Sequence, residues 1–140
     1  MNELVLNRPK EQIYRFRSYS IIVDDKHIAD LQNDSQQTLS LDSNEITIQA
    51  KVGRLSSNAK NFEFNDKKNL KLNIQGNRYY SKAFTLFGLL LIAEIGSEYL
   101  LDSFQTTISI IHLLTLLVAF YVIYTITFGK DSWITISKTS

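Results

Sequence analysis

Two long apolar runs dominate the second half of the chain. They cover residues 83–101 and 106–128, and no lysine or arginine occurs between Ala83 and Gly129. A helix rises about 1.5 Å per residue, so roughly 20 apolar residues cross the ~30 Å hydrocarbon core of a bilayer. The pattern predicts a transmembrane helical hairpin over residues 81–128, with a short turn centred on Ser103.

The charges that flank this hairpin predict its orientation. Arg78 and Lys82 precede the first run, and Lys130 follows the second. Lysine and arginine are enriched in the cytoplasmic segments beside membrane spans. Residues Met1–Gln12 contain no signal-peptide hydrophobic region, so the N-terminal part is expected to stay on the side of synthesis. We therefore expect a multi-pass protein of the cytoplasmic (inner) membrane, with both termini in the cytoplasm.

The first 80 residues alternate between apolar and polar with a period of two. The longest alternation, Glu45–Val52, places four apolar residues on one face, as in a half-buried antiparallel strand. The expected strands are Gln12–Val23, His27–Leu31, Thr38–Leu41, Glu45–Val52, a strand around Phe62 and Phe64, and Leu70–Ile74. We predict a membrane α+β fold in which residues 1–80 form a small antiparallel β-sandwich of about six strands.

Polar clusters separate the expected strands. Asp24, Asp25 and Lys26 suit a tight hairpin turn, because aspartate tolerates a positive φ and can bond its own backbone. Residues Gln32–Gln37 are expected to form the next turn. Met1–Lys10 has no clear period and holds the only proline, so we expect a lead-in that contributes at most an edge segment.

Residues 129–140 form a C-terminal tail with two interpretations. Trp133–Ser137 alternates as a strand does, and an edge strand added to the β-domain would explain the pattern. The alternative is a frayed tail that Trp133 anchors at the membrane surface. The sequence leaves both open.

Charge is distributed unevenly along the chain. All 15 basic residues and 11 of the 14 acidic residues lie outside residues 83–128, which leaves a net charge of +4 there. That charge suits an anionic membrane leaflet and is too sparse for nucleic-acid binding. The absence of cysteine excludes disulfides and thiolate metal sites, and no glycine-rich phosphate loop occurs. We expect no enzymatic activity, cofactor, metal or small-molecule substrate.

Ionisable residues inside the hairpin form a candidate polar site. Glu94, Glu98 and Asp102 follow one another at intervals of four, which makes one acidic stripe on the first helix. In a hairpin that turns at Ser103, Glu94 and His112 lie at the same depth and are close enough to pair. Such residues usually face a partner or a water-filled space. The stripe suggests a cation path in an oligomer, and the alternative is a Glu94 hydrated near the outer interface.

A second set of residues suits the membrane surface. Aromatic rings lie at headgroup depth while long cationic side chains reach toward phosphates. The predicted interface anchors are Arg78, Tyr79, Tyr80, Lys82, Lys130 and Trp133. Membrane lipid is therefore one expected partner.

The order of motifs within residues 20–58 resembles PEGA-like β-domains. The resemblance rests on Ile22–Ala29, Thr38–Leu41, Glu45–Lys51 and Ser57-Asn58. More specifically, it looks like the cytoplasmic part of small bacterial membrane proteins that place such a domain before a helical hairpin. The chain departs from the pattern at both turns, with Asp25 in place of glycine and Ser43-Asn44-Glu45 in place of a Pro-Gly-Glu type of turn. The resemblance implies the fold and topology, and no catalytic residues.

Three functions fit these features. The first is a non-enzymatic membrane adaptor or accessory protein whose cytoplasmic β-domain recruits a protein partner through an exposed sheet edge. The second is an oligomeric pore or ion-conducting protein lined by the acidic stripe. The third is an immunity-type protector against a membrane-active toxin.

Overall fold

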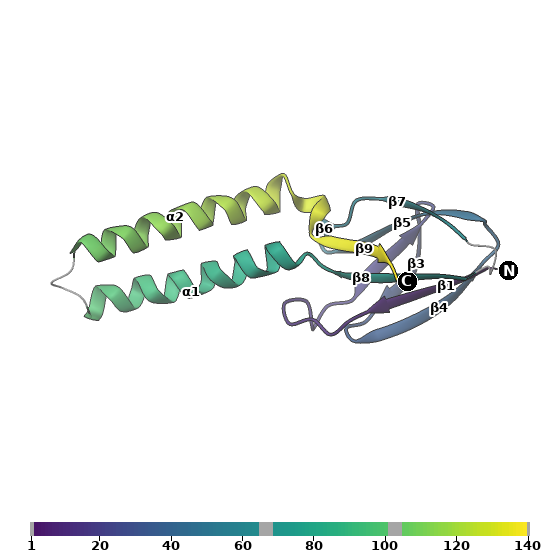
Figure 1. Ribbon diagram of the computed structural model, residues 1–140, viewed down its shortest axis with the longest axis horizontal. Coiled ribbons are helices and arrows are strands. Elements are labelled where there is room, and N and C mark those ends of the chain that lie inside the picture. The colour runs from purple at the N-terminus through teal and green to yellow at the C-terminus, as the bar shows by residue number, and fades with distance from the viewer. Residues whose placement is uncertain (1, 65–68, 101–104, 140) are drawn as a thin grey trace. The chain divides into compact units, whose positions relative to one another are not determined.

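A computed structural model describes residues 2–64, 69–100 and 105–139, without the side chains of residues 98–100 and 105–108. The chain divides into two compact units (Figure 1). Residues 1–77 and 130–140 form the first, which we call the β unit. Residues 78–129 form the second, the helical unit.

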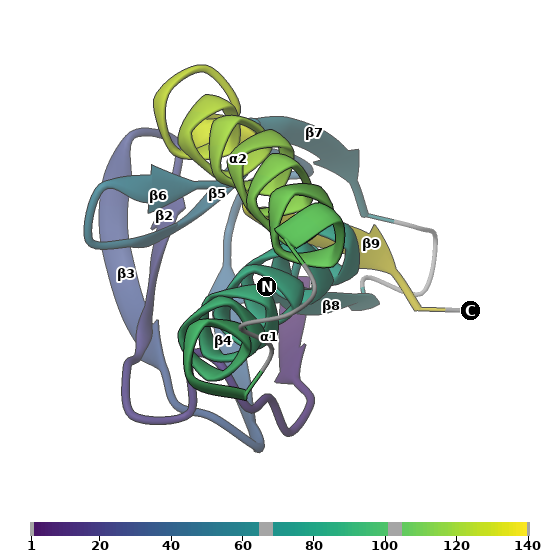
Figure 2. The same ribbon diagram turned by 90° about the vertical axis from the view of Figure 1, so that its left-hand side faces the viewer.

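The β unit contains two sheets (Figure 2). In the first, the strand order is β4 (Ser35–Leu41), β1 (Asn2–Arg8), β8 (Asn69–Gly76) and β9 (Ile134–Lys138). In the second, it is β3 (Lys26–Leu31), β2 (Tyr19–Val23), β5 (Glu45–Val52) and β6 (Leu55–Ser56), with β7 (Lys60–Glu63) also paired to β5. A short 3₁₀ turn, η1 (Lys130–Ser132), precedes β9.

One apolar cluster draws on both sheets. Alternate residues along each strand are buried, because successive side chains of a strand point to opposite faces. The fully buried members of this cluster are Leu4, Leu6, Tyr19, Ile21, Leu31, Ile48, Ala50, Leu70, Leu72 and Ile74. The prediction of a multi-strand β region followed by two apolar helices is confirmed.

Two strand predictions near the N-terminus are wrong. Residues 2–8 form β1, an interior strand between β4 and β8, and not a lead-in or an edge. The expected first strand Gln12–Val23 begins only at Tyr19, since residues 12–17 turn. Because β1 pairs with β8 in parallel, the first sheet is mixed and not purely antiparallel.

The predictions made from turn chemistry and from alternation agree more closely with the structure. Strand β5 has the predicted bounds, and β3 begins one residue earlier than expected. Asp24 and Asp25 both have positive φ, 48° and 63°, as the hairpin turn requires. Strand β4 begins at Ser35, so the expected turn Gln32–Gln37 ends three residues earlier than predicted. Its last residue, Asp34, has a positive φ of 55°.

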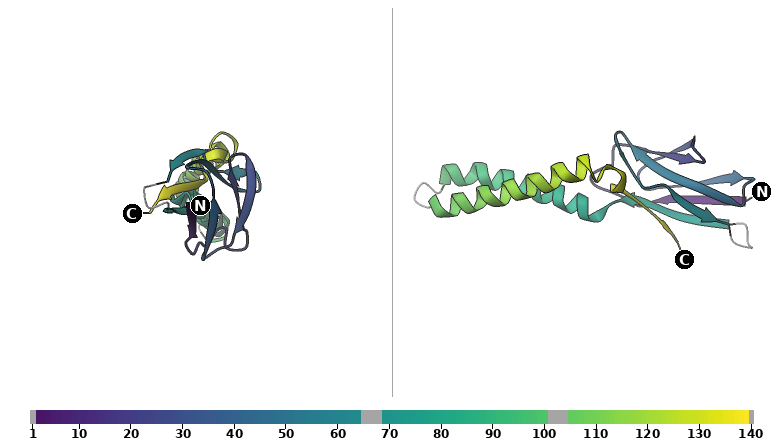
Figure 3. Two further views of the ribbon diagram at one scale, coloured as in Figure 1. Left: turned by 90° about the vertical axis from the view of Figure 1, so that its right-hand side faces the viewer. Right: turned by 90° about the horizontal axis from the view of Figure 1, so that it is seen from above.

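The C-terminal tail is a strand. β9 pairs antiparallel with β8, with Ile136 opposite Ile74, and Ile134 and Ile136 are buried. This pairing favours the edge-strand interpretation of the tail over the frayed one. Strands from both ends of the chain, β1 and β9, thus belong to one sheet (Figure 3).

The helical unit consists of α1 (Arg78–Leu100) and α2 (Gln105–Thr127). Each contains a stretch long and apolar enough to span a membrane, Arg78–Ser97 and Ser109–Thr127. Large apolar side chains face outward along both helices, and Ile92 and Phe120 are each 69% exposed. Small polar side chains, Ser97, Thr115 and Thr125, are buried.

Candidate functional site

Glu94 and His112 are in contact within the helical unit. A hydrogen bond joins the His112 Nδ1 to a Glu94 carboxylate oxygen. The Glu94 side chain is 25% exposed and the His112 side chain is 43% exposed. One turn further along α1, the Ser97 hydroxyl donates to the Glu94 carbonyl at 2.8 Å, as small polar residues in apolar helices often do. The depth-matched pair is therefore present as a local contact between α1 and α2.

The remainder of the acidic stripe is outside the described part of the chain. Glu98 lies on α1, but its side chain is not described. Asp102 belongs to residues 101–104, which are outside the described residues. A continuous acidic stripe stays a prediction.

Most of the predicted membrane anchors lie at the surface. Arg78, Tyr79 and Lys82 are exposed on the first turns of α1, and Lys130 is exposed on η1. Tyr80 is half-buried, and its ring packs edge-on against the Tyr121 ring of α2 at 6.5 Å between centroids. Contact with lipid headgroups stays a prediction for all five.

Trp133 does not fit the role of an anchor. It is only 4% exposed, and its ring packs edge-on against the Tyr14 ring at 6.5 Å between centroids. A ring this buried cannot reach lipid headgroups. Trp133 therefore belongs to the core of the β unit.

A buried ion pair organises the segment between β1 and β2. Arg8 is 1% exposed, and its Nε lies 3.2 Å from a Glu11 carboxylate oxygen. Its two other nitrogens donate to three backbone carbonyls, those of Tyr14, Arg17 and Leu31. The guanidinium also stacks 3.6 Å from the centre of the Tyr19 ring. Local pattern does not reveal this network, because a charged residue next to a proline resembles a loop.

Glu11 extends the network to β8. It accepts a hydrogen bond from the Tyr19 hydroxyl at 2.6 Å and another from the Gly76 backbone amide. Its own amide donates to the Asn33 side chain at 2.9 Å. Every buried side-chain nitrogen and oxygen among the described residues has a partner. The network is satisfied, which makes it costly to disturb.

We expect the β unit to lose stability as the pH rises above about 10. Burial, and secondarily the Glu11 charge, raises the pKa of Tyr14 from 10.0 to about 12. Burial and the hydrogen bond to Glu11 raise the pKa of Tyr19 further. A raised pKa means that the folded state holds the proton more tightly, so this stability is complete below the unfolded pKa and is lost as the pH approaches 12.

Urea midpoints followed by Trp133 fluorescence test this expectation. The chain contains one tryptophan, so the signal reports this site alone. The alkaline loss should be smaller in Tyr19→Phe than in the parent chain, because one titrating group is removed. Equal losses in both chains would contradict the assignment to Tyr19.

Arg8 also shapes an exposed turn. The Arg17 amide donates to the Tyr14 carbonyl at 3.0 Å, which closes a four-residue turn with Arg15 and Phe16 at its tip. Both Tyr14 and Arg17 carbonyls are fixed by Arg8. The Phe16 ring is 86% exposed, and the Arg15 guanidinium lies 4.2 Å from its centre. Sequence patterning assigns this aromatic residue to a strand, and so misses its exposure.

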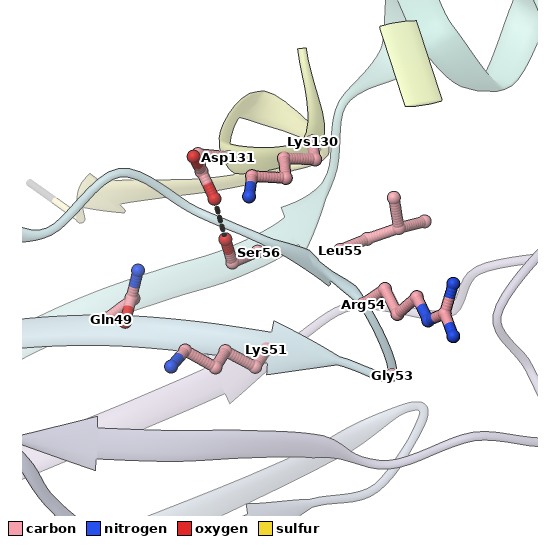
Figure 4. A pocket seen from close by; sticks show the side chains of 8 residues that line it. All are labelled: Gln49, Lys51, Gly53, Arg54, Leu55, Ser56, Lys130 and Asp131. Atoms are coloured by element: carbon pink, nitrogen blue, oxygen red, sulfur yellow. Dashed lines mark hydrogen bonds between the residues drawn. The ribbon is translucent and has the colours of Figure 1, made fainter. Parts of the chain in front are cut away.

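The β unit also contains a polar groove of about 250 Å³, and Gly53 and Arg54 are among its lining residues (Figure 4). Lys51, Arg54 and Lys130 are its three basic lining residues. Within it, the Ser56 hydroxyl donates to the Asp131 carboxylate at 2.6 Å. No cluster of residues suited to a metal occurs in the part of the chain that the structure describes. The three basic side chains outnumber the single carboxylate of Asp131, so the lining of the groove is mainly cationic.

Among the described residues β4 pairs with β1 alone, so its other edge is unpaired, and this edge differs from those of β3, β7 and β9. β4 is seven residues long, pairs with β1 in continuous register, and contains no charged residue and no proline. By contrast, β3 carries a pairing irregularity and an ion pair between His27 and Asp30. β7 carries Lys60 and Glu63, and the Ile136 carbonyl of β9 accepts a hydrogen bond from Lys60 at 2.8 Å. Bulges, charges and covering contacts normally prevent strand addition, and β4 has fewer of them than β3, β7 or β9.

No family model, curated protein or solved structure matches this chain.

Proposed function

We propose that this protein is a non-enzymatic membrane adaptor. In this proposal the β unit is a PEGA-like β-sandwich in the cytoplasm, and the helical unit is a transmembrane hairpin of the inner membrane. A protein partner binds by adding an extended strand to the free edge of β4. The uncharged, regular edge of β4 is the observation that carries the proposal.

The outward-facing apolar residues of α1 and α2 support membrane insertion. Only 6% and 17% of the two candidate spans are buried within the chain. The core helix of a water-soluble domain would be mostly buried, because exposed apolar area of this size is unfavourable in water. Lipid tails would cover these surfaces. The flanking Arg78, Lys82 and Lys130 support a cytoplasmic location for the β unit.

Strand addition suits the chemistry of β4. An incoming strand gains main-chain hydrogen bonds from the edge, and its side chains gain specificity from the pockets between edge residues. Exposed Gln36, Gln37, Thr38 and Ser40 offer amide and hydroxyl groups to such a strand. A charge introduced in the middle of the edge should block pairing without disturbing the core.

We expect site-specific photocrosslinking in native membranes to test this edge. A photoreactive residue at Thr38 should give one discrete adduct with a partner. The same residue at Asn58, an exposed position between β6 and β7, should give none. Adding Ser40→Lys should reduce the Thr38 adduct at least about tenfold, whereas the charge-matched Asn58→Lys should leave it unchanged.

The adduct's identity decides the outcome. A heterologous adduct that Ser40→Lys abolishes supports the adaptor. An adduct with twice the mass of the chain would instead mean that β4 pairs with a second copy. Equal adducts at both positions, or an adduct insensitive to Ser40→Lys, would overturn strand addition at β4.

The Glu94–His112 contact favours a second candidate, an oligomeric ion-conducting protein. A conducting assembly would present Glu94 of several copies to one water-filled path. The mass of the nanodisc-embedded particle separates the two functions. A closed ring of several copies supports conduction, whereas a monomer or dimer supports the adaptor.

A further inference from the structure

We propose that the turn Tyr14–Arg17 docks the β unit onto an anionic lipid surface, with Phe16 inserted between the headgroups. The inference rests on the proposed insertion of α1 and α2 into a membrane. It adds a second membrane contact, made by the β unit itself. We call residues Tyr14–Arg17 the docking turn.

The exposure of Phe16 is the first observation. Among the described residues of the β unit, the large apolar side chains that are clearly exposed are Phe16, at 86%, and Ile13, at 37%. Both lie in the segment between β1 and β2. An aromatic ring at the tip of a turn, with an apolar neighbour, is suited to shallow insertion at a membrane surface.

The charge around Phe16 is the second observation. Arg15 and Arg17 flank the ring in sequence, and the Arg17 guanidinium lies 3.5 Å from the position that a Cβ would take at Gly53. Gly53 precedes Arg54, which is also exposed. The nearby carboxylate of Glu11 is occupied by Arg8 and Tyr19. The docking turn and the neighbouring β5–β6 turn therefore present three arginines, which complement anionic headgroups.

The position of the docking turn along the chain is the third observation. The Tyr14 ring packs on Trp133, and the Trp133 carbonyl accepts a hydrogen bond from the Asn77 amide at 2.7 Å. Asn77 is the last residue before α1, and Lys130 directly follows the helical unit. Consecutive Cα atoms are only about 3.8 Å apart. Once the helices span a bilayer, these short connections keep Asn77 and Lys130, and with them this end of the β unit, within reach of the headgroups.

The buried network supplies rigidity. Arg8 binds the first and last carbonyls of the docking turn, so Phe16 is held outward before any lipid is present. A pre-organised loop loses little conformational entropy when it binds. The buried Arg8 thus holds in place the turn that exposes Phe16.

A fluorophore on a single cysteine tests the docking turn in the full-length protein. The chain contains no cysteine, so Gln12→Cys gives one label beside the turn and leaves Phe16 in place. Ser43→Cys labels the other end of β1, since the Ser43 carbonyl accepts a hydrogen bond from Asn2. Nanodiscs are made from phosphatidylcholine alone or mixed with phosphatidylglycerol, and a headgroup nitroxide lipid quenches labels at the surface.

We expect strong quenching at position 12 in the phosphatidylglycerol nanodiscs. Phe16→Asp should lower it severalfold, and Arg15→Gln should lower the ratio of docked to undocked protein roughly fivefold. Asn58→Asp, which adds the same charge at another exposed site, should leave the quenching at position 12 unchanged. Position 43 should be quenched weakly in every case.

Quenching at position 12 that Phe16→Asp leaves unchanged, or that is equal in neutral and anionic lipid, would overturn the proposal. Phe16→Ala serves as a second variant, and the urea midpoint shows that each variant is folded. No partner protein is present, so the result is independent of strand addition at β4. Failure of the chain to enter nanodiscs at all would instead count against membrane insertion of the hairpin.

Discussion

Replacing Arg8 with methionine is expected to destabilise the β unit by about 3–5 kcal/mol, because it leaves the mostly buried Glu11 carboxylate without its cation. Three backbone carbonyls also lose their donor. Small domains are stable by only about 5–15 kcal/mol, so most of the population should unfold under mild denaturation. The urea midpoint of the full-length protein, followed by Trp133 fluorescence, measures the effect.

Arg15→Met is the matched control for this change. Arg15 is exposed, so the same substitution there should shift the free energy of unfolding by less than about 0.5 kcal/mol. Arg8→Met combined with Glu11→Leu should recover part of the loss, since the uncompensated charge is removed with its partner. A midpoint of Arg8→Met equal to that of Arg15→Met would show that the ion pair contributes nothing to the fold.

Replacing Ile136 with alanine is expected to lower the free energy of unfolding by about 2–5 kcal/mol, the usual range when a fully buried aliphatic side chain is truncated to alanine. Ile136 is 1% exposed and pairs with Ile74 across the β8–β9 ladder. The size of the loss measures how much the C-terminal strand stabilises the β unit. The same urea titration reports it.

Ser137→Ala, at the neighbouring exposed position of β9, is the control and should change the midpoint little. If Ile136→Ala also left the midpoint unchanged, β9 would not be part of the stable core. In that case the interfacial-tail interpretation of residues 129–140 would regain support.

Both substitutions bear on the proposed function. Arg8 holds the docking turn and Ile136 holds the strand that follows the second helix. The adaptor needs a folded β unit, because only a folded sheet offers the β4 edge to a partner strand. Weakening either site should therefore impair partner recruitment in proportion to the folded fraction.

Local chemistry was enough to predict part of this structure. The alternation of Glu45–Val52 predicted β5, and two adjacent aspartates predicted a turn with positive φ. The apolar runs predicted two helices because their length and their lack of lysine and arginine can be recognised without knowing what they pack against. In each case the physical cause lies within a few residues.

The segment from Ile13 to Tyr19 shows where local chemistry failed. Its aromatic and β-branched residues favour a strand, but β propensity expresses packing against neighbours more than a preference of the backbone. Arg8 donates hydrogen bonds to the carbonyls of Tyr14 and Arg17 and so stabilises a turn. These hydrogen bonds outweigh the β propensity of the segment. Phe16 therefore lies at the tip of the turn, exposed, and not in the middle of a strand.

The sequence by itself determined the kinds of element, the alternating strands and the two apolar helices, and that Glu94 and His112 lie opposite one another. Only the tertiary structure decided that β1 lies inside a sheet, that β9 completes it and that β4 is left as an uncharged edge. β1 pairs with β8 across more than 60 residues, as Leu4 does with Leu70. Such pairings follow from shared burial between distant segments, which no local pattern contains.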